Sequence, residues 1–186
     1  MTFIFIASLI GSMIIISNGY IFNYLIFKKK IEDFNIFQDS IFGFIYIGFI
    51  ALLINFFLQI KKLIGLIFLI ISLIIFAYFF LKFRNKKKLI IILSYLSLTG
   101  FIILAFSTIN RPDAGLYHLP FISILNENKI IFGLTNLHYR FGQTSIFQYI
   151  SAIHVNYIFT EEFLNIPLAL LPCFYFLFLY ENLKNE

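Results

Sequence analysis

Long apolar stretches alternate with short polar connections along most of the chain. A membrane-spanning helix needs about 20 apolar residues, because the hydrocarbon core is about 30 Å thick and a helix rises about 1.5 Å per residue. Five stretches meet or approach this length, and we interpret each as a transmembrane helix: residues 2–27, 36–58, 63–81, 89–109 and 166–180. The pattern therefore predicts an all-α, polytopic transmembrane helical bundle of about five spans.

This pattern divides the chain into three parts. Residues 1–109 carry four transmembrane helices, residues 110–163 form an extracytoplasmic loop, and residues 164–186 hold the fifth helix with a short cytoplasmic tail. The first apolar stretch lacks the basic start and the cleavage site of a secretory signal, so we expect it to remain as a span.

The composition supports an integral membrane protein. Hydrophobic residues make up 61% of the chain and charged residues 12%, whereas soluble domains carry about 25% charged residues. This argues against a water-soluble enzyme and against a disordered tail. The single Cys173 excludes an internal disulfide and hence a disulfide scaffold.

Basic residues are distributed unevenly between the connections. Lysine and arginine crowd the connections around residues 28–30 and 82–88. The hairpin near residue 61 carries only two, and the three of the long segment 110–163 are spread along its length. Because basic residues favour the cytoplasmic side, we expect the N-terminus and the long segment outside. With no basic face on a soluble surface, nucleic acid is not an expected partner. We expect an integral protein of the bacterial inner membrane, with the lipid bilayer around its helices.

The long segment 110–163 holds all three histidines and is the most polar part of the chain. It is too polar to span and too apolar for a free loop, so we expect short amphipathic interfacial helices resting at the membrane surface. One is predicted to begin near Pro112 and a second near Gly142. His154, after the second helix, is interpreted as structural.

Candidate chemistry gathers in this segment. Asp113 is an isolated carboxylate next to the bilayer, where ionisable groups tend to be functional, although a helix-start role is nearly as well supported. Arg140 is suited to a phosphate or anionic head group, although a solvated position is an equal alternative. Tyr117, His118 and His138 complete the candidate set, and an aromatic belt is the main alternative for Tyr117.

Other polar residues have plainer interpretations. The histidines and Asp113 match no known metal-ligand spacing, so the metal requirement is open, with a divalent ion as one alternative. Asn18, Asn23 and Asn55 lie within spans and are expected to hydrogen-bond between helices.

The runs DAGLYHLP (113–120), NKIIFGLTN (128–136) and HYRFGQTSIFQYISA (138–152) resemble the first external loop of type C (GT-C) membrane glycosyltransferases, which include protein mannosyltransferases and aminoarabinose lipid transferases. The resemblance implies sugar transfer from a polyprenyl-phosphate donor on the outer face. Asp113 matches the acid that acts as base or orients the substrate. Tyr117 and His118 match the following aromatic pair, and His138 and Arg140 match the basic turn.

We therefore expect a membrane glycosyltransferase, or an N-terminal fragment of one, with catalytic Asp113 and with substrate bound by Tyr117, His118, His138 and Arg140. The expected partners are the lipid bilayer and a lipid-linked sugar donor. The alternative is a non-catalytic membrane subunit of an envelope polysaccharide or lipid assembly complex, in which other membrane subunits are the partners.

Overall fold

The computed structural model describes residues 2–106, 114–142, 145–160 and 163–185, and within these ranges the protein is helical, with no strand. The α-helices are α1 (Thr2–Phe27), α2 (Ile36–Phe57), α3 (Lys62–Lys82), α4 (Lys86–Ala105), α5 (Leu119–Glu127), α6 (Ile146–His154) and α7 (Ile166–Asn185). Shorter turns are η1 (Ile31–Asp33), η2 (Ala114–His118), η3 (Leu134–Asn136) and η4 (Tyr139–Gly142). Five of these helices, α1 to α4 and α7, are long and apolar enough to cross a membrane, which confirms the predicted spans.

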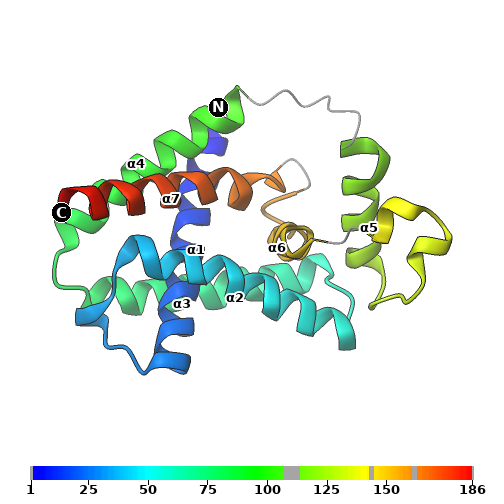
Figure 1. Ribbon diagram of the computed structural model, residues 1–186, viewed down its shortest axis with the longest axis horizontal. Helices are drawn as coiled ribbons and strands as arrows, with labels where there is room; N and C mark the ends of the chain where they lie inside the picture. The colour runs from blue at the N-terminus through cyan, green and yellow to red at the C-terminus, as the bar shows by residue number, and fades with distance from the viewer. Residues whose placement is uncertain (1, 107–113, 143–144, 161–162, 186) are drawn as a thin grey trace.

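Helix α1 is the centre of the bundle. It packs against α2, α3, α4 and α7, and in Figure 1 it runs down the picture while α2, α3 and α7 run across it. Glycine permits the closest of these crossings: a Cβ on Gly43 of α2 would collide with the carbonyl oxygen of Ile15, and one on Gly19 with that of Asp39. Small residues let helix backbones approach in membranes, where dispersion forces drive packing.

Hydrogen bonds define two ends of the bundle. At the lysine-rich end, which comprises residues 28–35, 82–86 and the end of α7, Glu181 accepts from Asn35 at 2.7 Å and pairs with Lys88 at 3.3 Å. At the opposite loop end, which comprises residues 58–61 and 114–142, Asn55 donates to the carbonyl of Asn128 at 3.0 Å. The two lysine-rich connections thus lie at the same end, as the predicted topology requires.

The short helix α6 enters the bundle rather than resting on its surface. Residues 148–154 are all buried, and α6 contacts α2, α3, α5 and α7. Two glycines make room for it: Gly48 of α2 lies against Ile146 and Ile150, and Gly65 of α3 lies against the carbonyl of Val155. The interfacial position expected for this helix therefore applies only to its first residues. A stretch whose side chains are uncharged can be buried in this way without the cost of desolvating a charge.

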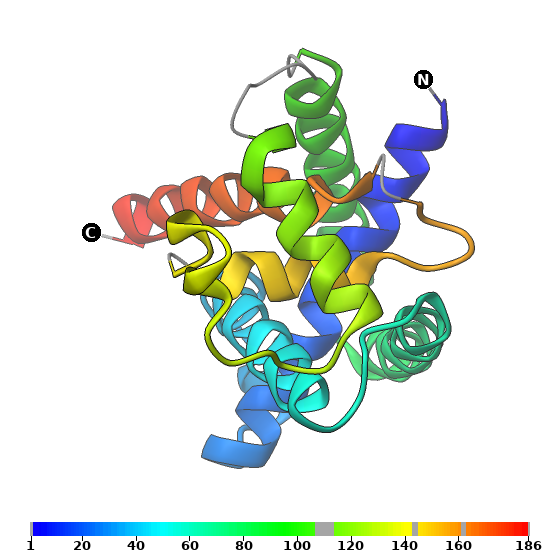
Figure 2. The same cartoon turned by 90° about the vertical axis from the view of Figure 1, so that its right-hand side faces the viewer.

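Helix α5 covers α6 at the loop end. Figure 2, which looks towards this end, shows α5 lying across the front of α6. Phe121, Ile122 and Leu125 form the buried face of α5. Pro120 lies in the first turn of this helix, where backbone N–H groups have no acceptor within the helix, so the N–H that proline lacks is not needed there. The turns on either side of α5 in the chain, η2 before it and η4 after it, carry the candidate site.

Candidate functional site

The candidate site lies at the loop end, where η2 and η4 meet in front of α6. Four of the five predicted site residues belong to these turns or their flanks: Tyr117, His118, His138 and Arg140. The fifth, Asp113, lies outside the described residues. We call Tyr117, His118, His138, Tyr139 and Arg140 the aromatic–arginine cluster.

Arg140 is the centre of the cluster. Its guanidinium carbon lies 5.2 Å from the ring centroid of Tyr117 and 5.7 Å from that of Tyr139, within cation–π range of both. Its Nε also donates a hydrogen bond to the Tyr139 hydroxyl at 3.0 Å. A planar guanidinium fixed in this way loses little conformational freedom when it meets an anion, so the arrangement is preorganised for a carboxylate or phosphate.

His118 connects the cluster to α6. Its ring centroid lies 4.1 Å from that of Tyr117, and its Nδ1 lies 3.3 Å from Nε2 of Gln148. Gln148 also accepts from the backbone N–H of Ser145 as part of the capping box at the start of α6. An amide Nε2 is a donor, so Nδ1 of His118 accepts in this arrangement and the ring proton belongs on Nε2. His118 is thereby oriented by a helix end.

His138 joins the cluster indirectly. It is exposed, its Nδ1 accepts from the backbone N–H of Arg140 at 3.2 Å, and its ring stacks on Tyr139 with centroids 5.0 Å apart. The structure therefore brings Tyr117, His118 and Arg140 into direct proximity and attaches His138 through Tyr139.

Sequence reasoning missed two members of this arrangement, Tyr139 and Gln148. Tyr139 carries no motif, because its role follows from the turn that folds it over Arg140. Gln148 could have been found, since Ser145 and Gln148 have the spacing of a capping box before an apolar run.

A small hollow lies beside the cluster, between α5 and the segment 129–142, with a volume of about 220 Å³. Phe121, Phe141 and Tyr149 supply aromatic walls, and Lys129 lines the same hollow. Arg140 precedes Phe141 in the chain but does not line the hollow, so Lys129 is the cation at its wall. An aromatic recess with a cation at its wall suits an amphipathic anion.

No group of three or more potential ligands among histidine, cysteine, aspartate and glutamate occurs in the part of the chain that the structure describes. Asp113 is not among those residues, so the predicted choice between a metal-dependent and a metal-independent site stays open.

His154 is held apart from this chemistry. Its Nδ1 lies 2.6 Å from the carbonyl oxygen of Ile150, and burial lowers its pKa from 6.5 to about 4. Its ring packs edge-on against Phe68 of α3. A neutral histidine in this setting is structural, as the sequence predicted.

The asparagines in the spans behave as two classes. Asn18 donates to Ser72 of α3 at 3.0 Å, and Asn55 donates to the backbone carbonyls of Leu125 in α5 and of Asn128 just after it, so both join separate segments as predicted. Asn23 instead donates to the carbonyl of Gly19 in its own helix. The interhelical hydrogen bond predicted for Asn23 is therefore wrong.

Comparison with known proteins gives one match. A family model described as a domain of unknown function (DUF8201) matches residues 1–186. No curated protein and no solved structure matches the chain.

Proposed function

The chain belongs to the DUF8201 family, and from the geometry at its loop end we propose that it binds the anionic head group of a lipid-borne substrate there, as a membrane glycosyltransferase of the GT-C type or an N-terminal fragment of one. The donor in this proposal is a polyprenyl-phosphate sugar. The observation that carries the proposal is the Arg140 guanidinium, 5.2 Å from the Tyr117 ring and 5.7 Å from that of Tyr139.

The cluster supplies the binding half of such a reaction. In glycosyl transfer an acceptor oxygen forms a bond to the anomeric carbon while the bond from that carbon to the phosphate oxygen breaks, and the phosphate leaves with the electron pair. Arg140 would stabilise the charge on this leaving phosphate. Tyr117 holds the guanidinium, and His118, oriented by Gln148, offers a hydrogen bond to the sugar or phosphate.

Asp113 takes the acid–base role that the GT-C resemblance implies. In this proposal its carboxylate accepts the proton of the acceptor hydroxyl as that oxygen attacks the anomeric carbon. Asp113 precedes η2 by one residue in the chain, so it is close in sequence to Tyr117 and His118.

We further propose that the N-terminus and the loop end face the outside of the bacterial inner membrane. The gathering of both lysine-rich connections at the opposite end supports this orientation, because nine of the fourteen lysine and arginine residues would then be cytoplasmic. If this orientation is right, a membrane-impermeant maleimide added from outside should label a cysteine introduced at exposed Leu137 and should not label one introduced at Lys87. Labelling of Lys87→Cys from outside would mean that the orientation is the reverse of the one proposed.

Binding of a lipid phosphate tests the site directly. The purified protein in nanodiscs is titrated with undecaprenyl phosphate, and Arg140→Ala should weaken binding on the order of tenfold or more, because a charged hydrogen-bond partner is lost. Lys61→Ala removes a cation from the same end without touching the cluster, and it should bind normally. Equal affinity of Arg140→Ala and the unchanged protein would refute the proposal.

A second candidate, the non-catalytic subunit of an envelope polysaccharide or lipid assembly complex, is favoured by a different observation. Phe132 and Leu137 in the loop-end segment are 83% and 78% exposed, and large exposed apolar side chains mark contact surfaces. Photo-crosslinkers at these two positions would capture a membrane partner in cells if the subunit role is correct. Crosslinking to lipid alone would argue against it.

A further inference from the structure

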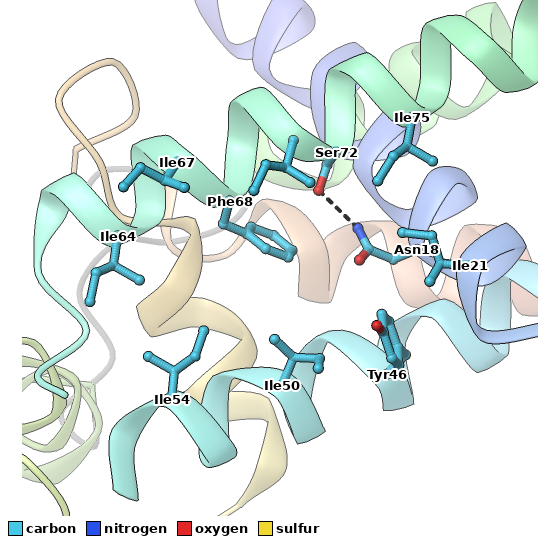
Figure 3. Close-up of a pocket in the computed structure, with 11 residues that line it drawn as sticks. Asn18, Ile21, Tyr46, Ile50, Ile54, Ile64, Ile67, Phe68, Ser72 and Ile75 are labelled. Carbon is cyan, nitrogen blue, oxygen red and sulfur yellow. Dashed lines mark hydrogen bonds between the residues drawn. The ribbon is translucent and has the colours of Figure 1, made fainter. Parts of the chain in front are cut away.

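A groove on the side of the bundle separates two helices that follow one another in the chain. Helices α2 and α3 are joined by residues 58–61 yet do not pack side by side; α1 and α6 each contact both of them instead. The space between them has a volume of about 230 Å³. Figure 3 shows α2 and α3 as its two walls, with α1 and α6 behind.

Most residues that line this groove are aliphatic, and Tyr46 and Phe68 are its aromatic members. Ile50 and Ile54 of α2 face Ile64 and Ile67 of α3 across it (Figure 3). Ile71 also lines the groove, and no charged residue does. Isoleucine is branched at Cβ and holds few rotamers, so these walls are stiff. Ile67 and Ile71 are 48% and 51% exposed, which shows that the groove opens at the surface of the bundle.

The floor needs no polar ligand. Its polar side chains are Asn18, Ser72 and Tyr46, and the Asn18 amide donates to Ser72 at 3.0 Å and to the carbonyl of Ile14 at 2.8 Å. With the Asn18 donors satisfied within the protein and one tyrosine hydroxyl beside them, a head group or a row of waters would gain little by entering. The groove therefore selects for hydrocarbon.

The surroundings determine which hydrocarbon is available. The groove runs along two membrane-spanning helices, from their middle parts at Tyr46 and Ile75 to Ile54 and Ile64 near the loop end, so most of it faces the acyl region of the bilayer rather than water. We propose that it is a lipid-binding site that takes one acyl chain of a phospholipid, held between α2 and α3. It is separate from the aromatic–arginine cluster and stands whether or not that cluster binds a sugar donor.

Retention of phospholipid in detergent provides the test. The protein is stripped of lipid, dioleoylphosphatidylcholine is added back in micelles, and native mass spectrometry measures how much stays bound. The unchanged protein should retain one phospholipid per chain. The variant Ile67→Phe/Ile71→Phe fills the groove and should lower retention on the order of tenfold, since its rings occupy the space that the acyl chain would take.

Ile70→Phe/Ile74→Phe is the matched control on the same helix. These side chains are 49% and 64% exposed and do not line the groove, so retention should be unchanged. A second pair of variants lies on the facing helix α2, where Ile50→Phe should lower retention and Ile45→Phe should not. This pair tests the proposal if circular dichroism shows that the double variant on α3 has lost helix.

Three results would overturn the proposal. One is an unchanged protein that retains no phospholipid. Another is equal loss in the groove and control variants. The third is loss caused by Arg140→Ala, which would place the lipid at the aromatic–arginine cluster instead.

Discussion

The guanidinium carbon of Arg140 lies 5.2 Å from the ring centroid of Tyr117, which joins two turns that α5 and a long connection separate in the chain. A desolvated cation–π contact contributes about 2 kcal/mol, and an exposed one about 0.5 to 1 kcal/mol. The contact therefore sets the direction of the cation more than it stabilises the fold. This makes Tyr117 a positioning residue for Arg140.

Replacing Tyr117 separates these two effects. We expect Tyr117→Leu to weaken binding of undecaprenyl phosphate about three- to tenfold, while Tyr117→Phe, which keeps the ring, stays close to the unchanged protein. Isothermal titration in nanodiscs measures both. Equal weakening in the two variants would show that the hydroxyl, and not the ring face, is what matters.

The glycine crossing between α1 and α2 gives a stability prediction. Gly43→Leu should destabilise the bundle by several kcal/mol, because its side chain would occupy the space of the Ile15 carbonyl and Gly19. The midpoint of unfolding in a denaturing detergent measures this. Gly115→Ala is the control, since a Cβ there meets nothing within 4 Å.

How far the sequence predicted this molecule depends on the range of the interactions. The five spans follow from local hydropathy and are confirmed, and Asn18 was correctly expected to join helices. The burial of α6 was not foreseen, because it depends on Gly48 and Gly65, which are distant in sequence and provide room only once α2 and α3 are placed. The same holds for Tyr139, whose position over Arg140 is made by a turn.

An ion pair with a buried carboxylate at the lysine-rich end gives a third prediction. Asp39 is 1% exposed and accepts from the partly exposed Lys29 at 2.7 Å and from the backbone N–H of Asn35 at 2.7 Å. Asp39→Leu leaves Lys29 without its carboxylate and the Asn35 amide without its acceptor, and an unsatisfied donor of this kind costs about 1–3 kcal/mol. We expect the unfolding midpoint in the same detergent assay to fall accordingly.

Asp33 supplies the control for this pair, because it is exposed in the neighbouring η1 turn. Asp33→Asn should leave the free energy of unfolding within about 0.5 kcal/mol of that of the unchanged protein. If Asp39→Leu also changed the free energy of unfolding by no more than that, the ion pair would not contribute to stability.

His154 predicts how stability depends on pH. Burial lowers its pKa in the folded protein to about 4, whereas an unfolded chain has the ordinary value of 6.5. As pH falls from about 6.5 towards 4, the unfolded state therefore takes up a proton that the folded state refuses, and the free energy of unfolding declines. Below about 4 both states are protonated and this contribution levels off. The decline across the window is on the order of 3 kcal/mol.

The variant His154→Leu isolates this effect from other acid titrations. It removes the titrating ring and leaves an apolar side chain beside Phe68, so its unfolding free energy should fall less steeply between pH 6.5 and 4 than that of the unchanged protein. Parallel pH curves for the variant and the unchanged protein would mean that His154 is protonated alike in both states, and that α6 admits water.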